Sequence, residues 1–295
     1  MLAKWLSAGY IENDTYLETE SGVPQGGIIS ASLLVITLSG LEHAIKTSTR
    51  SKDKVNLCVY ADDFVITGAT PEILQDKVRP IVESFLSERG LVLSPTKTCL
   101  THINGGFDFL GTNVRKYKGK LICKPAKSNV LAFLRDIRHT IKSNSNAKTE
   151  NLIHLLNPKI RGWANYHRHN CSKNTFSKAK SDIFEALWRW AKRRHPHKGH
   201  KWIYRKYFRS TGHRNWVFNA TIKDANGNKK HLDLVDIKKT PIKRHIKIRA
   251  EATPYDHAYQ AYFAERLKRR KEKRLATPCK SSWSAWWEIP DTIST

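Results

Sequence analysis

Residues 55–68 read VNLCVYADDFVITG. Apolar and β-branched side chains flank Ala61-Asp62-Asp63 on both sides, which predicts two strands joined by a tight turn. Asp62 and Asp63 are adjacent carboxylates that repel each other at neutral pH, and such apolar flanks offer them no partner. A Mg²⁺ ion resolves the conflict, because it prefers carboxylate oxygens and takes its other ligands from water and phosphates. An ordinary acidic turn is the alternative.

The segments around this hairpin mix helical and strand signals, which favours an α+β fold. A helical run is expected after Gly26 and Gly27, and a helix over 71–89 that bends at Pro80 and stops at Gly90. Strands are expected at 98–103 and 107–114, joined by the turn Asn104-Gly105-Gly106, and a second hairpin pairs 113–117 with 120–123.

After Pro125 the apolar spacing becomes helical. Val130, Leu134, Ile137 and Ile141 repeat on one face, which predicts a first helix. A second helix begins near Leu152 and is expected to break at Pro158, and a third includes 183–191. From residue 211 the chain is basic and reads as irregular, until a helix over 255–275.

The charge is distributed unevenly along the 295 residues. Residues 1–110 carry 9 basic and 13 acidic side chains, whereas residues 111–295 carry 43 basic and 13 acidic ones, a net charge of +30. So basic a segment repels itself unless it lies beside a polyanion, and nucleic acid is the usual one. The longest nearly apolar run, Ile28–Leu38, has 11 residues, against about 20 for a membrane-spanning helix. We expect no membrane partner and a cytoplasmic location.

Four blocks resemble those of reverse transcriptases, in that family's order. They are SGVPQGGIIS (21–30), YADD (60–63), GLVLSPTKT (90–98) and FDFLGTNV (107–114). LNPKIRGWANYHRH (156–169), FEALWRWAKRRHP (184–196) and TPIKRHIKI (240–248) resemble the maturase, or X, region of group II intron-encoded proteins. The chain therefore resembles the bacterial type of group II intron reverse transcriptase and maturase over nearly its whole length.

The resemblance implies three regions. Residues 1–124 correspond to a partial reverse-transcriptase palm, an antiparallel sheet with helices. Residues 125–210 correspond to a helical thumb, or maturase-specific X domain, and residues 211–295 to a basic DNA-binding region.

The resemblance also assigns roles to residues. Asp62 and Asp63 become catalytic residues and ligands of a two-metal Mg²⁺ site, and Lys97 holds a phosphate or gives a proton to leaving pyrophosphate. The template and nucleotide site takes Tyr60, Ala61, Pro24, Gln25, Gly26 and Gly27, and the primer grip takes Phe109, Leu110 and Gly111. The RNA-binding residues are Arg161, Trp163, Tyr166, Arg168, Arg193 and Arg194. For Trp163, a place in the helix core is an equal alternative.

The chain departs from the family pattern at both ends. The family takes a further aspartate and its fingers from blocks that precede SGVPQGG. We expect no nuclease domain of the His-Asn-His type, because no second late cysteine accompanies Cys279. We expect an RNA-directed DNA polymerase and maturase whose isolated chain polymerises poorly, acting on group II intron RNA, target DNA, primer and dNTPs near the bacterial nucleoid. A homodimer or a separate N-terminal fragment is left open as a further partner. The alternative is a non-catalytic module that binds and folds intron RNA.

Overall fold

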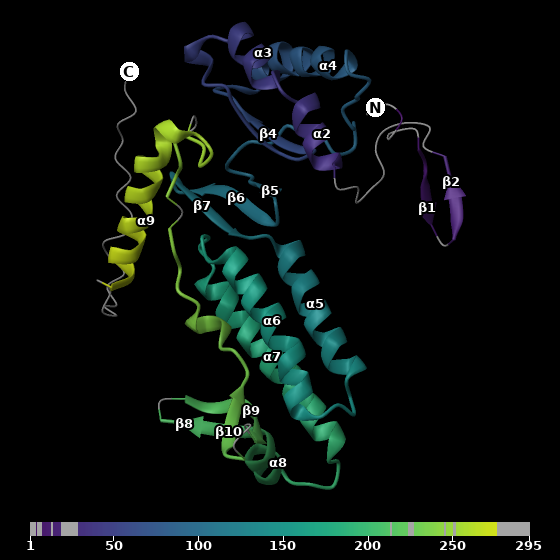
Figure 1. Cartoon of the computed structure of the whole chain (residues 1–295), viewed down its shortest axis with the longest axis vertical. Coiled ribbons are helices and arrows are strands. Elements are labelled where there is room, and N and C mark those ends of the chain that lie inside the picture. The colour runs from purple at the N-terminus through teal and green to yellow at the C-terminus, as the bar shows by residue number, and fades with distance from the viewer. Residues whose placement is uncertain are drawn as a thin grey trace. The chain divides into compact units, whose positions relative to one another are not determined.

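The computed structural model describes residues 4, 8–12, 14–18, 29–212, 214–223, 227–244, 246–249 and 252–275. The chain divides into two compact units, Met1–Lys243 and Arg244–Thr295. Helices and short antiparallel sheets follow one another along the chain (Figure 1), so the expected mixture of helix and strand is confirmed. In the described ranges, no helix has the length and apolar content that crossing a membrane requires.

The first core of unit 1 forms between helices and one face of a hairpin. Its elements are α3 (Leu41–Ser48), β3 (Asn56–Tyr60), β4 (Asp63–Thr67) and α4 (Arg79–Ser87). Helix α2 (Ser30–Thr37) precedes α3 and has no buried residue. A short sheet of β1 (Tyr10–Glu12) and β2 (Thr15–Leu17) comes earlier in the chain. The buried side chains of this core come from α3, α4 and the turn before α4: Leu41, Ile45, Val78, Val82, Phe85 and Leu86.

The helix predicted over 71–89 is confirmed, and Pro80 disturbs it as expected. A π-helical segment, Ile73–Val78, lies immediately before α4, and Pro80 is in the first turn of α4. Proline lacks an N–H and clashes with the preceding turn, and a wider π turn accommodates that defect. Gly90 ends the helix with φ +69°, and the Leu91 N–H donates to the Leu86 carbonyl at 2.9 Å.

A three-stranded antiparallel meander follows, with β5 (Phe107–Phe109), β6 (Thr112–Tyr117) and β7 (Lys120–Pro125). The hairpin predicted at 113–123 is confirmed. The single strand predicted at 107–114 is wrong, because a turn at Leu110 and Gly111 divides it. The strand predicted at 98–103 does not form: residues 98–102 are all exposed and offer no buried face to pair.

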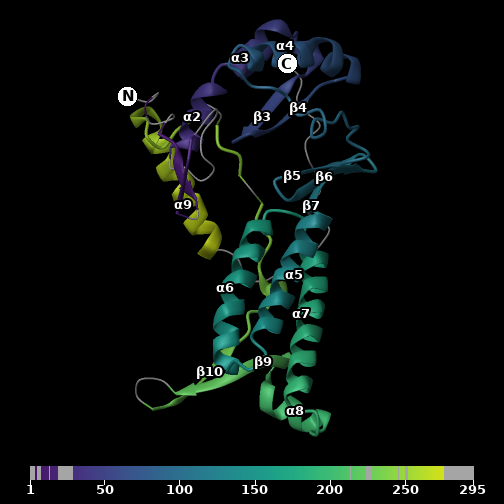
Figure 2. The same cartoon turned by 90° about the vertical axis from the view of Figure 1, so that its right-hand side faces the viewer.

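The second core of unit 1 lies in a helical bundle. Its helices are α5 (Lys127–Ser143), α6 (Thr149–His167), α7 (Lys173–Arg194) and α8 (His200–Tyr207). Figure 2 shows α5, α6 and α7 running side by side. The periodic residues Leu134, Ile137 and Ile141 are buried here, as are Leu187 and Trp190 of α7, so the first and third predicted helices are confirmed.

The break predicted at Pro158 is wrong, since α6 continues through it to His167. A proline inside a helix costs about 3 kcal/mol. Ile153, Leu156 and Ile160 are buried on both sides of Pro158, and we infer that their packing offsets that cost.

The region after residue 208 is more regular than its sequence indicates. β8 (Phe208–Thr211), β9 (Arg214–Lys223) and β10 (Lys229–Asp233) form an antiparallel sheet whose Phe208 and Phe218 join the second core. In unit 2, α9 (Gln260–Leu275) begins five residues later than the helix predicted at 255–275, after a 3-10 turn at His257–Tyr259.

Candidate catalytic hairpin and nucleic-acid interface

The β3–β4 hairpin presents Asp62 and Asp63 at its tip. Tyr60 and Asp63 are paired across the hairpin, and Ala61 and Asp62 form the two-residue turn between them. Ala61 takes a left-handed φ of +52°. This is the positive φ that tight hairpin turns of the primed types require at their first central residue.

The two faces of the hairpin differ in what they contact. Leu57, Phe64 and Ile66 pack against the first core, and strand alternation places Tyr60 and Asp63 together on the opposite face. Tyr60, Asp62 and Asp63 are exposed. The two carboxylates therefore lie in solvent, and the apolar side chains that pack on the helices do not bury them.

The donor set of the hairpin tip matches what Mg²⁺ takes from proteins. One or two carboxylates usually suffice, and water and substrate phosphates complete the octahedron. Exposure leaves the coordination space around Asp62 and Asp63 open to such ligands. Among the described residues, no group of three or more His, Cys, Asp or Glu side chains could hold a metal.

The other residues assigned to catalysis lie apart from the hairpin in the sequence. Lys97 is exposed and lies in a turn, where its backbone N–H donates to the Ser94 carbonyl at 3.2 Å. Pro24, Gln25, Gly26 and Gly27 lie outside the described residues.

The residues predicted to form the primer grip lie where β5 meets β6: Phe109 ends β5, and Leu110 and Gly111 form the tight turn. Leu110 and Gly111 both have positive φ, +47° and +68°. A Cβ on Gly111 would lie 2.8 Å from Nδ2 of Asn129, which is closer than packed atoms approach. Both the backbone conformation and the neighbouring amide therefore require glycine at this position.

Helices α5 and α6 hold this turn by hydrogen bonds. The Tyr166 hydroxyl donates to the Leu110 carbonyl at 2.8 Å, and the Ala126 N–H donates to the Gly111 carbonyl at 2.9 Å. Nearby, Asn170 donates from Nδ2 to the Thr112 hydroxyl at 2.9 Å. Tyr166, predicted to bind RNA, thus also fixes the backbone of the predicted primer grip.

A buried polar network lies behind the turn. Oδ1 of Asn129 accepts from Nε1 of Trp163 at 2.8 Å and lies 2.9 Å from Nε2 of His167, which donates because that oxygen can only accept. His167 has no exposed surface, and burial lowers the pKa of its imidazole to about 4. A neutral imidazole therefore completes the network at neutral pH. The sequence did not identify Asn129 or the buried role of His167.

Trp163 packs against the helix core, as the second of its two interpretations expected. Its ring stacks on Phe133 with centroids 4.4 Å apart and planes 10° apart, and it meets Phe176 edge-on at 5.8 Å. With its N–H also engaged, the packing of the ring favours the core interpretation over RNA binding.

The four predicted RNA-binding arginines divide into two groups. Arg161 and Arg193 are exposed on α6 and α7. Arg168 is half-buried beside Asn165, and Arg194 donates to the carbonyls of Ser145 and Ala147. Arg194 also lies over the Trp190 ring at 4.6 Å. Its guanidinium therefore stabilises the α5–α6 loop, and the prediction that Arg194 binds RNA stays a prediction.

Comparisons with known proteins identify the two parts of unit 1. Residues 1–114 match the family described as reverse transcriptase (RNA-dependent DNA polymerase), and residues 130–208 match the group II intron maturase-specific domain. Protein YkfC of Escherichia coli (strain K12) is 31% identical over 143 residues, covering 38% of this chain and 37% of that protein. Maturase-like protein 1 of Euglena gracilis is 26% identical over 144 residues, covering 48% of this chain and 29% of that protein.

These matches span about a third of each relative's own length. The reverse-transcriptase match includes the hairpin with Asp62 and Asp63 and the β5–β6 turn at Leu110 and Gly111. The maturase match includes α6, whose Tyr166 holds that turn. The chain belongs to the family of group II intron reverse transcriptases and maturases.

Proposed function

We propose that this protein is an RNA-directed DNA polymerase and maturase that acts with a group II intron RNA. The observation that carries the proposal is the hairpin tip, where Asp62 and Asp63 are exposed on a scaffold packed against helices. A surface loop of ordinary structure has no need of paired carboxylates in a conformation that includes a non-glycine residue at positive φ.

Different residues of the chain are proposed for the separate roles in nucleotide transfer. Asp62 and Asp63 would hold Mg²⁺, which supplies activation of a 3′ hydroxyl and charge stabilisation on pyrophosphate. Lys97 holds or protonates the departing phosphate. Tyr60, Ala61 and the segment 24–27 contact template and nucleotide, and Phe109, Leu110 and Gly111 position the primer end.

The basic part of the chain holds nucleic acid. Arg161, Tyr166, Arg168 and Arg193 are assigned to intron RNA, whose phosphates attract cations and whose unpaired bases stack on aromatic rings. Region 211–295 is assigned to target DNA, with the regional boundaries at 124/125 and 210/211 that the family resemblance implies. A cytoplasmic, nucleoid-associated location follows from these partners.

A non-catalytic intron RNA-binding module is the second candidate. It is supported by the absence, among the described residues, of a third metal-binding side chain beside Asp62 and Asp63. On the same ground we propose that synthesis by this chain alone is weak. The second candidate uses the same fold and predicts RNA binding without metal binding.

Metal and RNA binding, measured separately, distinguish the two candidates. Calorimetric titration of Mn²⁺ into the full chain should show binding that Asp62→Asn abolishes, while Asp76→Asn, an exposed carboxylate outside the hairpin, leaves it intact. Primer extension on poly(rA)/oligo(dT) should show any synthesis to be lost with Asp62→Asn. Tight binding of intron RNA without Asp62-dependent metal binding would establish the second candidate instead.

A further inference from the structure

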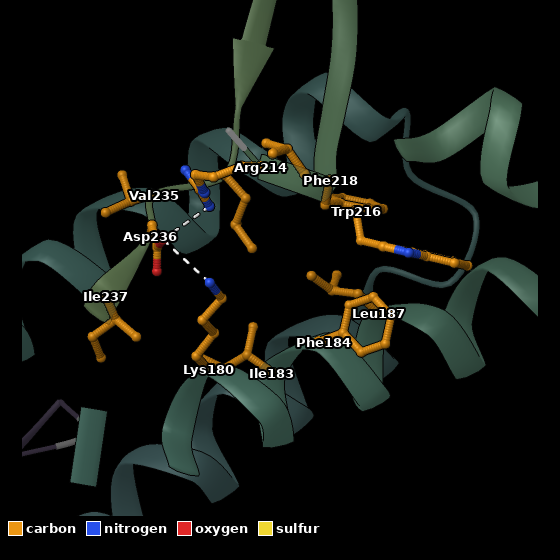
Figure 3. Close-up of a pocket in the computed structure, with 12 residues that line it drawn as sticks. Lys180, Ile183, Phe184, Leu187, Arg214, Trp216, Phe218, Val235, Asp236 and Ile237 are labelled. Carbon is orange, nitrogen blue, oxygen red and sulfur yellow. Dashed lines mark hydrogen bonds and ion pairs between the residues drawn. The ribbon is translucent and has the colours of Figure 1, made fainter. Parts of the chain in front are cut away.

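A hollow in the second core of unit 1 lies far in sequence from the polymerase blocks. Its walls come from α7, from β9 and from the segment after β10 (Figure 3). The apolar wall includes Ile183, Phe184, Leu187 and Trp216, and the charged side chains are Lys180, Arg214 and Asp236.

The charged side of the hollow is net positive. Asp236 accepts from Nζ of Lys180 at 3.2 Å and from Nη2 of Arg214 at 3.1 Å. One carboxylate thus faces two cations, which leaves a net charge of +1. Nε of Arg214 is buried and has no hydrogen-bond partner among the described residues, and an unsatisfied buried donor indicates a missing acceptor.

Trp216 is held at the other side by an irregular strand. Between the pairs Arg209↔Val217 and Thr211↔Arg214, β9 has one more residue than β8, which defines a β-bulge. Trp216 lies in the bulge with φ +63°, a conformation that favours glycine and is unusual for a bulky side chain. Strain of this kind, in a bulge that redirects a side chain, is frequent at binding sites.

The indole of Trp216 has room for a stacked partner. It is 47% exposed, and its aromatic neighbours Phe184, Trp188, Tyr204 and Phe208 meet it at interplanar angles of 60–87°. None of these rings lies parallel to it. No described aromatic ring therefore stacks on the indole, and its exposed part is available to a flat, stacked group.

We propose that this hollow binds an unpaired nucleotide of an RNA strand, with the base on Trp216 and the phosphate beside Lys180 and Arg214. An aromatic face next to net positive charge is the combination that single-stranded nucleic acid requires. The basic 111–295 segment supplies the long-range attraction. The inference rests on the proposed RNA-binding function, but it assigns that function to residues other than those of α6.

The test compares Trp216→Leu and Trp216→Phe in the full chain. Fluorescence anisotropy measures binding to a labelled RNA with an unpaired loop, a fully paired RNA of equal length and a single-stranded DNA. Trp216→Leu should weaken binding to the loop RNA by about 5- to 150-fold, the range found for the loss of one base–aromatic stack. Trp216→Phe should retain most of the affinity for the loop RNA. Neither variant should change binding of the paired RNA.

Salt dependence and a matched tryptophan provide the controls. Trp216→Leu should leave the slope of log affinity against log salt unchanged, whereas Lys180→Gln should reduce its magnitude by about 0.7 for one lost phosphate contact. Trp202→Leu removes another exposed indole, 38% exposed on α8 and outside the hollow, and should have less effect. Circular dichroism melts confirm that each variant is folded.

Each result has a defined meaning. If the wild-type chain binds no RNA, the proposed function itself fails. If it binds RNA but Trp216→Leu and Trp216→Phe have equal affinities for the loop RNA, the hollow does not take an unpaired base. The same conclusion follows if Trp216→Leu weakens binding of the paired RNA as much as binding of the loop RNA. Equal weakening with single-stranded DNA extends the site to nucleotides of either sugar and overturns its restriction to RNA. A changed oligomeric state with unchanged RNA affinity would assign the hollow to a protein partner and overturn the proposal.

Discussion

Replacing Gly111 by alanine should destabilise the protein through two separable effects. The first is the left-handed backbone at φ +68°, which costs an L-residue about 1–2 kcal/mol. The second is displacement of Asn129, since the new Cβ would lie 2.8 Å from Nδ2. That shift weakens the hydrogen bonds of Asn129 to Trp163 and His167, at about 1 kcal/mol each. The expected total is about 3–4 kcal/mol.

Gly119 is the matched control for the backbone effect. It lies in the β6–β7 turn of the same sheet at φ +81°, and a Cβ there meets nothing within 4 Å. Gly119→Ala should therefore cost only the backbone penalty of about 1–2 kcal/mol. Urea denaturation monitored by circular dichroism gives both free energies of unfolding.

A double-mutant cycle isolates the contact with Asn129. In the background of Asn129→Ala the clashing amide is absent, so Gly111→Ala should then cost no more than Gly119→Ala does. Strict additivity of the Gly111 and Asn129 changes would refute the reasoning, as would equal costs for Gly111→Ala and Gly119→Ala in the otherwise unchanged protein.

Three further changes test the core, the buried histidine and the paired arginines. Trp163→Ala should lower the free energy of unfolding by about 3–5 kcal/mol in urea titrations, whereas Tyr166→Ala, 58% exposed one turn later, should cost far less. The pKa of His167 is about 4 in the folded protein and about 6.5 unfolded, so the folded state binds fewer protons between these values. Stability contributed by this group should be full above pH 6.5 and fall by about 3 kcal/mol towards pH 4, and His167→Gln should remove that dependence. Arg193→Ala should reduce the magnitude of the salt slope of RNA binding by about 0.7–0.9 with little change in stability. Arg194→Ala leaves the carbonyls of the α5–α6 loop without their donor, so it should lower the stability and leave the salt slope nearly unchanged. Salt titrations of RNA binding and thermal melts of both variants measure these two quantities.

Periodicity identified the elements whose apolar faces are long and continuous. Helices α5 and α7 follow directly from spacings such as Leu134 to Ile141, because burial of one stripe determines where the helix lies. Local chemistry also located the turns at Gly90 and at Lys118-Gly119, where Gly90 and Gly119 have positive φ. In these cases the deciding interactions are only a few residues apart in the sequence.

The errors arise where distant residues decide the structure. Proline stops a helix by local rules, yet Pro158 lies between buried residues that the bundle holds in helical form. Asn129 is 34 residues from Trp163 and 38 from His167, so no local pattern indicates that they meet. The spacing of Trp163 and His167 on one helical face was the available signal, and its aromatic and basic character was assigned to RNA instead.

The β5–β6 turn at Leu110 and Gly111, which is predicted to be part of the primer grip, connects the two family matches in one structural element. Its backbone belongs to the reverse-transcriptase match, while Tyr166, whose hydroxyl donates to the Leu110 carbonyl at 2.8 Å, belongs to the maturase match. The ring of Tyr166 is exposed, while its hydroxyl is hydrogen-bonded to the Leu110 carbonyl. A base that stacks on the ring would therefore contact the same side chain that holds the turn. Under the proposed function, we therefore expect RNA bound on α6 and the primer end held at 109–111 to influence each other through this one hydrogen bond.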